Sequence, residues 1–214
     1  MKALWFAVAT LFFANFAAAQ SPAAEPSPLA IALAQRYMAA TGGTYELILQ
    51  QSYVAAGILG DTPTSHARQR AMQQATDEHR NELTQLDVAL ASLVARTFTQ
   101  NELVVAVNFL ESSAGRSVTV KKHAYFAEMF TRDRPPLTFT PEENSALAAF
   151  GQTPEAISMS AKTPSMMAQT LALSTPVQQA IQKSAAQIYC HASPACINGG
   201  DDFDRRAGPS IREP

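Results

Sequence analysis

The residues whose side chains could carry out chemistry are few and widely spaced. His79 and Glu82 are three residues apart, a spacing that places both on one helix face and would suit a metal ion. Carboxylate-bridged metal sites in helical bundles need several such pairs, and no other pair of this kind occurs in the sequence. Metal-dependent or hydrolytic chemistry through His79, Glu82, His123 or the Cys190-His191 segment therefore requires distant side chains to converge. The remaining histidine, His66, adds no further pair.

The two cysteines, Cys190 and Cys196, are six residues apart, with Ser193 and Pro194 between them. In an oxidising compartment this spacing predicts a disulfide that contributes roughly 2 kcal/mol on the chain-entropy model. Zinc binding through Cys190, His191 and Cys196 is the alternative, although the spacing matches no familiar zinc motif. The sequence also lacks a Gly-x-Ser-x-Gly elbow, a Ser-x-x-Lys pair, a His-Glu-x-x-His motif, a phosphate loop and a Cys-x-x-Cys motif. We expect no catalytic residues, cofactor or bound metal.

The N-terminus has the composition of an export signal. A Met1-Lys2 start precedes residues 3–16, which are apolar apart from two polar side chains. Small residues then lead to a predicted cleavage site between Ala19 and Gln20. About 14 apolar residues are too few for a membrane-spanning helix, which needs roughly 20. We therefore expect a signal peptide over residues 1–19, a mature protein in the bacterial periplasm or outside the cell, and no later transmembrane segment.

The mature chain would contain 195 residues (214 minus 19), enough for a single domain. Loss of Lys2 leaves 15 basic side chains (16 minus 1) against 18 acidic ones, a net charge of −3 with no long run of either sign. Binding of nucleic acid needs a clustered positive field, so this class of partner is excluded. Composition predicts a flexible linker over residues 20–28, a folded domain over 29–196 and a disordered tail over 197–214.

Apolar residues recur at helical spacing and predict an all-α fold, a single bundle of about six to eight helices. The first two expected helices cover residues 29–40 and 44–59, separated by Gly42-Gly43. The longest covers residues 65–97 and carries a narrow apolar seam, which predicts packing inside the bundle. Pairing of the seam with a second copy of the chain, as a homodimer, is the alternative. The seam consists of Met72, Thr76, His79, Leu83, Leu86, Leu90, Leu93 and Thr97.

Helix starts are marked clearly in the second half of the chain. Thr99 and Glu102 have the spacing of a capping box, in which each side chain bonds the backbone amide of the other residue. Four Thr-Pro pairs follow, and each predicts an N-cap threonine before a proline at the first helical position. These pairs are Thr140-Pro141, Thr153-Pro154, Thr163-Pro164 and Thr175-Pro176. We expect a series of short helices broken at these pairs, the last from Pro176 to about Tyr189.

A weak internal repeat appears at an offset of 41 residues. The aligned pairs are Phe98-Thr99 with Phe139-Thr140, Glu102 with Glu143, Ala106 with Leu147, Phe109 with Phe150, Ser112 with Thr153 and Ser117 with Ser158. The shared pattern is a capped helix that ends in an aromatic residue, followed by a hydroxyl residue able to cap the next helix. It predicts a duplicated helical hairpin.

The first copy of this pattern resembles the bacterial exported family called domain of unknown function 2059, over about residues 80 to 130. The resemblance is carried by Phe98, Thr99, Glu102, Phe109, Ser112, Ala114 and Gly115. The chain departs from the family pattern at Ser113, where proline is frequent, and at Leu110, where a second aromatic residue is frequent. The resemblance implies an all-helical, exported protein and supplies no known activity. The motif itself has a packing explanation, because Thr99 and Glu102 cap a helix, Phe109 anchors it and Ala114-Gly115 permits close backbone approach.

These observations favour a non-enzymatic helical module of the cell envelope that binds a protein, a peptide or an apolar ligand. Met159, Met166 and Met167 suit an adaptable binding surface, and ordinary core packing is the alternative for them. A metal-dependent or hydrolytic periplasmic enzyme and a homodimer through the long-helix seam are the competing functions.

Overall fold

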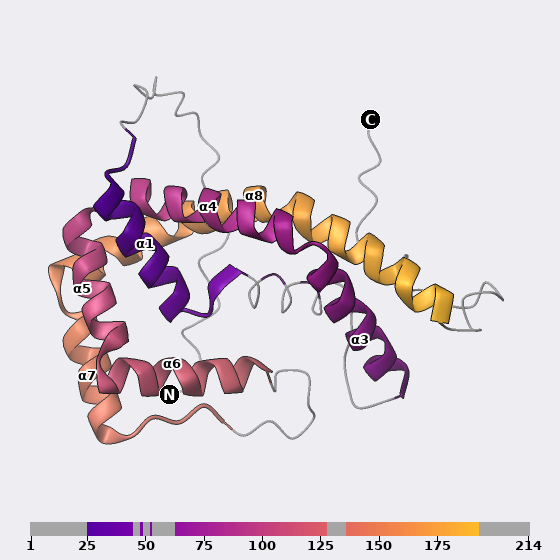
Figure 1. The fold of residues 1–214 in the computed structure, drawn as a ribbon. Coiled ribbons are helices and arrows are strands. Elements are labelled where there is room, and N and C mark those ends of the chain that lie inside the picture. Colours follow the sequence, from indigo (N-terminus) through magenta and orange to yellow (C-terminus); the bar gives the residue numbers. More distant parts are fainter. Residues whose placement is uncertain (1–24, 45–47, 49–51, 53–62, 128–135, 193–214) are drawn as a thin grey trace, which may run out of the picture.

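The protein is described by a computed structural model, which covers residues 25–44, 48, 52, 63–127 and 136–192. Within these ranges it contains seven α-helices and no β-strand, as the periodicity predicted (Figure 1). The helices are α1 (Pro28–Ala40), α3 (Pro63–Glu78), α4 (Arg80–Thr97), α5 (Gln100–Glu111), α6 (Ser113–Ala127), α7 (Pro141–Gly151) and α8 (Pro154–Ala192).

Helix α1 begins and ends where the sequence predicted. The Ser27 hydroxyl accepts a hydrogen bond from the Ala30 amide at 3.1 Å, and Pro28 occupies the first helical position. Gly42 and Gly43 have φ angles of 115° and 69°, left-handed values that end the helix at little steric cost. Most of the helix expected over residues 44–59 lies outside the described residues.

The long helix expected over residues 65–97 is two helices, so this prediction was wrong. α3 ends at Glu78 and α4 begins at Arg80, with His79 between them at φ −93° and ψ 22°. Neither proline nor glycine is present at this point, and hydrogen bonds from the His79 amide to Ala75 and from the Leu83 amide to His79 persist, both at 3.1 Å. The two helices are inclined to each other in Figure 1, and this bend allows both to lie along α8.

The short helices expected after Thr163 and Thr175 are also wrong, because α8 runs unbroken through Pro164 and Pro176. An interior proline costs about 3 kcal/mol, so packing must outweigh it. α8 packs against α3, α4 and α5, which supplies that packing. The threonine hydroxyls bond the carbonyls of Met159 and Leu171, at 2.8 and 2.7 Å, and so join the helix interior instead of capping a new start.

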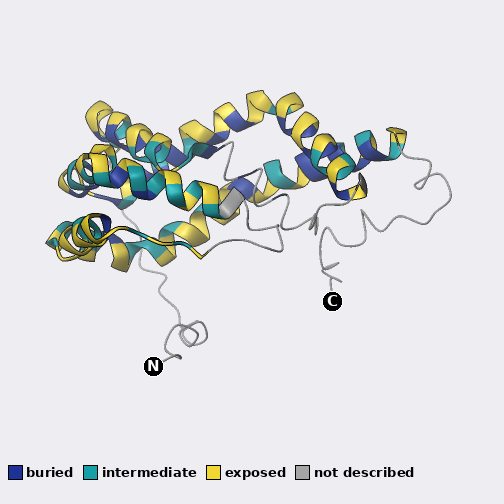
Figure 2. Cartoon of the chain, turned by 90° about the horizontal axis from the view of Figure 1, so that it is seen from below, coloured by how far each residue is buried: buried dark blue, intermediate teal, exposed yellow. Residues whose placement is uncertain are grey.

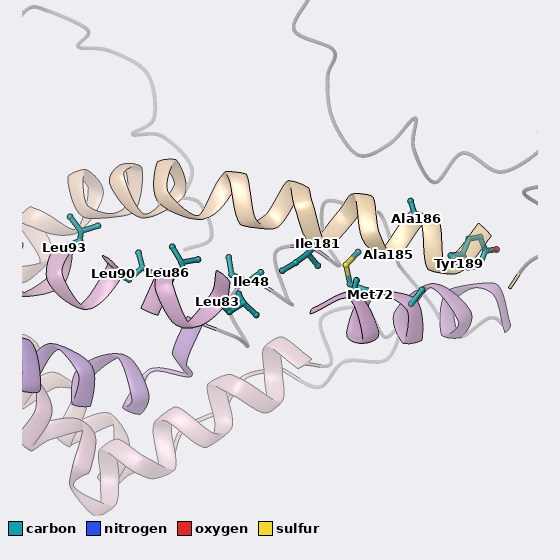
Figure 3. Packing of buried hydrophobic residues seen from close by; sticks show 12 residues of the cluster. Ile48, Met72, Leu83, Leu86, Leu90, Leu93, Ile181, Ala185, Ala186 and Tyr189 are labelled. Carbon is teal, nitrogen blue, oxygen red and sulfur yellow. The ribbon is translucent and has the colours of Figure 1, made fainter. Parts of the chain in front are cut away.

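Among the residues that the structure describes, the core consists of two clusters that share α4 and α8. One joins α3, α4 and the C-terminal half of α8, and Figure 3 shows its side chains pointing between the helices. The other joins α1, the end of α4, α5 and Met159 at the start of α8. The predicted seam is internal, since Met72, Leu83 and Leu93 are buried against α8 of the same chain. Figure 2 shows the buried residues as a stripe on the inner side of each long helix.

Several predictions concern residues outside the described ranges. These are the signal peptide at 1–19, most of the linker at 20–28 and the tail at 197–214. They stay predictions. In the described part of the chain, no helix combines the length and the apolar character that a membrane span requires.

Candidate functional site

The motif that begins at Phe98 forms a capping box with an additional partner from far along the chain. The Thr99 hydroxyl accepts from the Glu102 amide at 3.2 Å, and the Glu102 carboxylate accepts from the Thr99 amide at 2.6 Å. The ammonium group of Lys162, in the third turn of α8, lies 2.7 Å from both carboxylate oxygens. Glu102 is buried, and a lysine 60 residues away along the chain compensates its negative charge.

The second copy of the motif forms the same arrangement at Thr140 and Glu143. The Thr140 hydroxyl accepts from the Glu143 amide at 3.2 Å, and the carboxylate accepts from the Thr140 amide at 2.8 Å. The distant partners come from α6, where the Ser117 hydroxyl and the Lys121 ammonium group each donate to Glu143 at 2.6 Å. Glu143 is the buried residue of α7, as Glu102 is a buried residue of α5.

These contacts shift both carboxyl groups in the same direction. Burial raises the pKa of Glu102, but hydrogen bonds from Lys162, Ser158 and the Thr99 amide lower it more, to about 2. Hydrogen bonds from Lys121, Ser117 and the Thr140 amide likewise hold the pKa of Glu143 at about 2. Both groups are therefore ionised and fully engaged at neutral pH, which suits a structural role and not the proton exchange of a general acid or base.

The two arrangements are related by the repeat offset. Ser117 and Lys121 plus 41 are Ser158 and Lys162, so each glutamate binds the serine and lysine of the other copy. The alignment by motif had matched Ser117 with Ser158 but had missed the lysines. Their signal was present in the sequence, since Lys121 and Lys162 obey the same offset of 41. What the sequence does not state is that the contacts cross between the copies.

Between the two copies lies an aromatic contact of residues that the repeat aligned. The rings of Phe109 and Phe150 are stacked, with centroids 4.4 Å apart and an angle of 8° between their planes. Each ring comes from the equivalent position of its own copy. The predicted anchoring role of Phe109 is thus an anchor against its counterpart in the repeat. Phe98, at the start of the motif, packs instead edge-on against Tyr37 of α1 with centroids 6.1 Å apart.

The corners after the two aromatic residues are also alike. The Ser112 hydroxyl donates to the Phe109 carbonyl at 2.6 Å and accepts from the Gly115 amide at 3.0 Å. In the second copy Thr153 bonds Phe150 and Ala156 in the same way, at 2.8 and 3.2 Å. The copies differ in crowding. A Cβ atom at Gly115 would lie 1.9 Å from the Phe109 carbonyl oxygen, so this corner requires glycine, and the close approach predicted at Ala114-Gly115 is present.

The histidines have separate surroundings. His79 Nδ1 lies 3.5 Å from the Glu82 carboxylate at the junction of α3 and α4. His123 Nε2 lies 3.2 Å from the Thr41 carbonyl oxygen, and His66 and His191 are exposed. Among the residues that the structure describes, no three His, Cys, Asp or Glu side chains gather as a metal site would require. The convergence that the enzyme alternative needs is not present in that part of the chain.

The cysteine prediction stays untested. Cys190 lies in the last turns of α8 and packs, half-buried, against the cluster shared with α3. Cys196 lies outside the described residues, so neither the disulfide nor the zinc alternative with His191 is decided.

An apolar surface on the middle of α8 is the remaining candidate. Residues 163–182 include no charged side chain. Met167 and Leu171 lie four residues apart on one face of this segment, with exposed fractions of 57% and 48%, and Ile157 is 59% exposed nearer the helix start. The three methionines differ in exposure. Met159 is buried, Met166 packs half-buried against both clusters, and Met167 is exposed.

Comparison with known proteins adds no assignment to this geometry. The resemblance of residues 80 to 130 to domain of unknown function 2059 therefore rests on the residues of the motif alone. No protein-family model, no curated protein and no solved structure matches the chain.

Proposed function

We propose that the protein is an exported, non-enzymatic module of the bacterial envelope that binds a partner protein through α8. The single observation that carries this proposal is the apolar face of Met167 and Leu171, defined here as the α8 face. These side chains remain exposed on a helix that also packs against α3 and α4. An apolar surface that the chain leaves uncovered is typical of a binding site.

The chemistry of the α8 face favours the apolar side of an amphipathic helix as the ligand. Methionine and leucine side chains adapt to irregular apolar surfaces, and the absence of charge over residues 163–182 removes any electrostatic recognition. The two buried glutamates do not compete with this assignment, because both are committed to internal lysines.

Photocrosslinking tests the binding role. A photoreactive amino acid at Leu171 should yield a discrete adduct in envelope extracts of the native host. The same group at Gln169, which is exposed on α8 but two residues from both Met167 and Leu171 and so on another face, is the matched control and should yield none. The crosslinked protein, once identified and purified, should bind the wild-type chain and lose at least tenfold in affinity towards Met167→Lys/Leu171→Lys. Equal labelling at both positions, or equal affinity for the variant, would refute the proposal.

Export is a separate part of the proposal and has its own test. The positive start, the apolar run of residues 3–16 and the small residues before Gln20 support cleavage after Ala19. Expression in a Gram-negative host followed by fractionation should recover the protein in the periplasm with Gln20 at its N-terminus, and non-reducing mass spectrometry should find Cys190 joined to Cys196. A full-length cytoplasmic product would contradict this part.

A further inference from the structure

The contacts between the two hairpins have the form of a symmetric homodimer interface within one chain. The first hairpin is α5 with α6, and the second is α7 with the start of α8. Each hairpin presents a glutamate, a serine, a lysine and a phenylalanine, and each of these meets the complementary or identical residue of the other hairpin. In an isologous interface residue i contacts j and j contacts i, which is the relation of Glu102–Lys162 to Glu143–Lys121.

We propose that each hairpin is self-complementary, so that the surface by which the two hairpins bind each other also accepts the same hairpin of a second copy of this chain. In such a pair Glu102 of one copy binds Lys121 of the other, and Phe109 stacks on Phe109. No residue type is needed beyond those that already form the intrachain contacts. The partner class is thus a second copy, and the contacts that form this surface include neither Met167 nor Leu171 of the α8 face.

The covalent connection explains why the intrachain pair prevails in the native chain. Residues 128–140 join α6 to α7, and a connection of this length holds the second hairpin at a high effective concentration, on the order of millimolar. Pairing between copies competes only when the intrachain contacts are made unfavourable. The crossed ion pairs offer a way to do this, because they can be reversed in one hairpin alone.

The variant Glu143→Lys/Lys162→Glu reverses the second hairpin. Within one chain both sites then hold like charges, Glu102 with residue 162 and Lys121 with residue 143. Between two copies of the variant, like hairpins still present opposite charges to each other, Glu102 to Lys121 and residue 143 to residue 162. The matched control reverses both hairpins, by adding Glu102→Lys and Lys121→Glu, and restores opposite charges within the chain. The control loses two capping carboxylates and the test variant only one. Damage to helix caps therefore cannot explain association that occurs in the test variant and not in the control.

Sedimentation at micromolar concentration should show the mass of the test variant doubling relative to the control, which should match the wild type. Adding Phe109→Cys to each, with Cys190 and Cys196 replaced by serine, should give an interchain disulfide in the test variant alone. Equal masses for the two proteins, or a folded test variant without the crosslink, overturn the proposal.

A milder variant covers the case in which the test variant fails to fold. Glu143→Gln/Lys162→Glu keeps a side chain that can complete the capping box, and it sets the same preference through the single repulsion at Glu102. It should associate at least tenfold more tightly than Glu143→Gln alone. If it is folded and no more associated than Glu143→Gln, like hairpins do not pair and the proposal is wrong.

Discussion

The two copies of the hairpin keep the same pairing residues but differ at other positions of their first helix. On α5 these positions are apolar, and Leu103, Ala106 and Val107 are buried. At the positions 41 residues later, α7 has Asn144, Leu147 and Ala148, of which none is buried. The difference follows from the neighbours, since α1 packs on α5. No described helix covers α7 in the same way, apart from its contacts with α6 and α8.

The comparison separates two kinds of constraint on one motif. Residues that pair the copies, such as Glu102 with Glu143 and Phe109 with Phe150, have the same identity in both. The other positions follow their surroundings, since they are apolar and buried where α1 packs on α5 and include the polar Asn144 on the more exposed α7. A residue that pairs the copies is therefore expected to be the same in both, whereas one that packs on other parts of the chain is free to differ.

The largest effect on stability should come from the positions that differ between the copies. Leu103→Ala removes a side chain with no exposed surface and should cost about 3 kcal/mol of the free energy of unfolding. Asn144→Ala, at the equivalent exposed position, should change it by less than about 0.5 kcal/mol. Urea denaturation of both variants measures the contrast. Similar losses at the two positions would break the distinction between the copies.

The next effect should come from the corners. Gly115→Ala places a Cβ atom 1.9 Å from the Phe109 carbonyl oxygen, so the backbone must move, at a cost of about 2 kcal/mol. The reciprocal change Ala156→Gly removes a methyl group in the first turn of α8 and should cost at most about 1 kcal/mol. The same denaturation experiment compares them. A neutral Gly115→Ala would mean that the first corner is no tighter than the second.

The smallest effect should come from the residues that the copies share. The pKa of both Glu102 and Glu143 is about 2 in the folded chain, below the ordinary value of 4.5, so their stabilisation is complete above pH 4.5 and is lost as the pH falls through 2. For Glu102 this amounts to about 1 kcal/mol, once screening at the partly exposed Lys162 is allowed for. Thermal midpoints from pH 7 to pH 2 measure the loss.

The matched variants for this titration are Glu102→Gln and Glu143→Gln. Each should flatten the dependence of the midpoint on pH below 4.5, and to a similar degree, because the two sites have the same donors. If only one variant flattened it, the two sites would not be energetically equivalent.

Local signals in the sequence were sufficient for much of the fold. Helical periodicity, the Thr99 and Thr140 caps and the Gly42-Gly43 stop each act within a few residues, and the structure follows all of them. The repeat also identified Phe109 and Phe150 as equivalent positions, but it did not predict that their rings stack on each other. Helix continuity was not predictable in this way, because the same Thr-Pro pair begins a helix at Thr140 and lies inside one at Thr163.

Tertiary packing decides between these outcomes. Thr163 and Thr175 lie between stretches that both contribute to the core, Met159 on one side and Ile181 on the other, so the helix is maintained through the prolines. The break at His79 has the same origin, since no local residue requires it. The crossed glutamate contacts depend on how two hairpins dock, and spacing along the chain carries no information on docking.

The length of α8 links parts of the molecule that otherwise have little in common. A helix of 39 residues spans about 58 Å at 1.5 Å per residue, and it carries Lys162 near one end and Tyr189 near the other. The single helix α8 thus takes part both in the pairing of the two hairpins and in the core cluster that joins α3, α4 and α8. Melting should therefore proceed as a single cooperative event, with probes at Tyr37 and Tyr189 reporting the same midpoint.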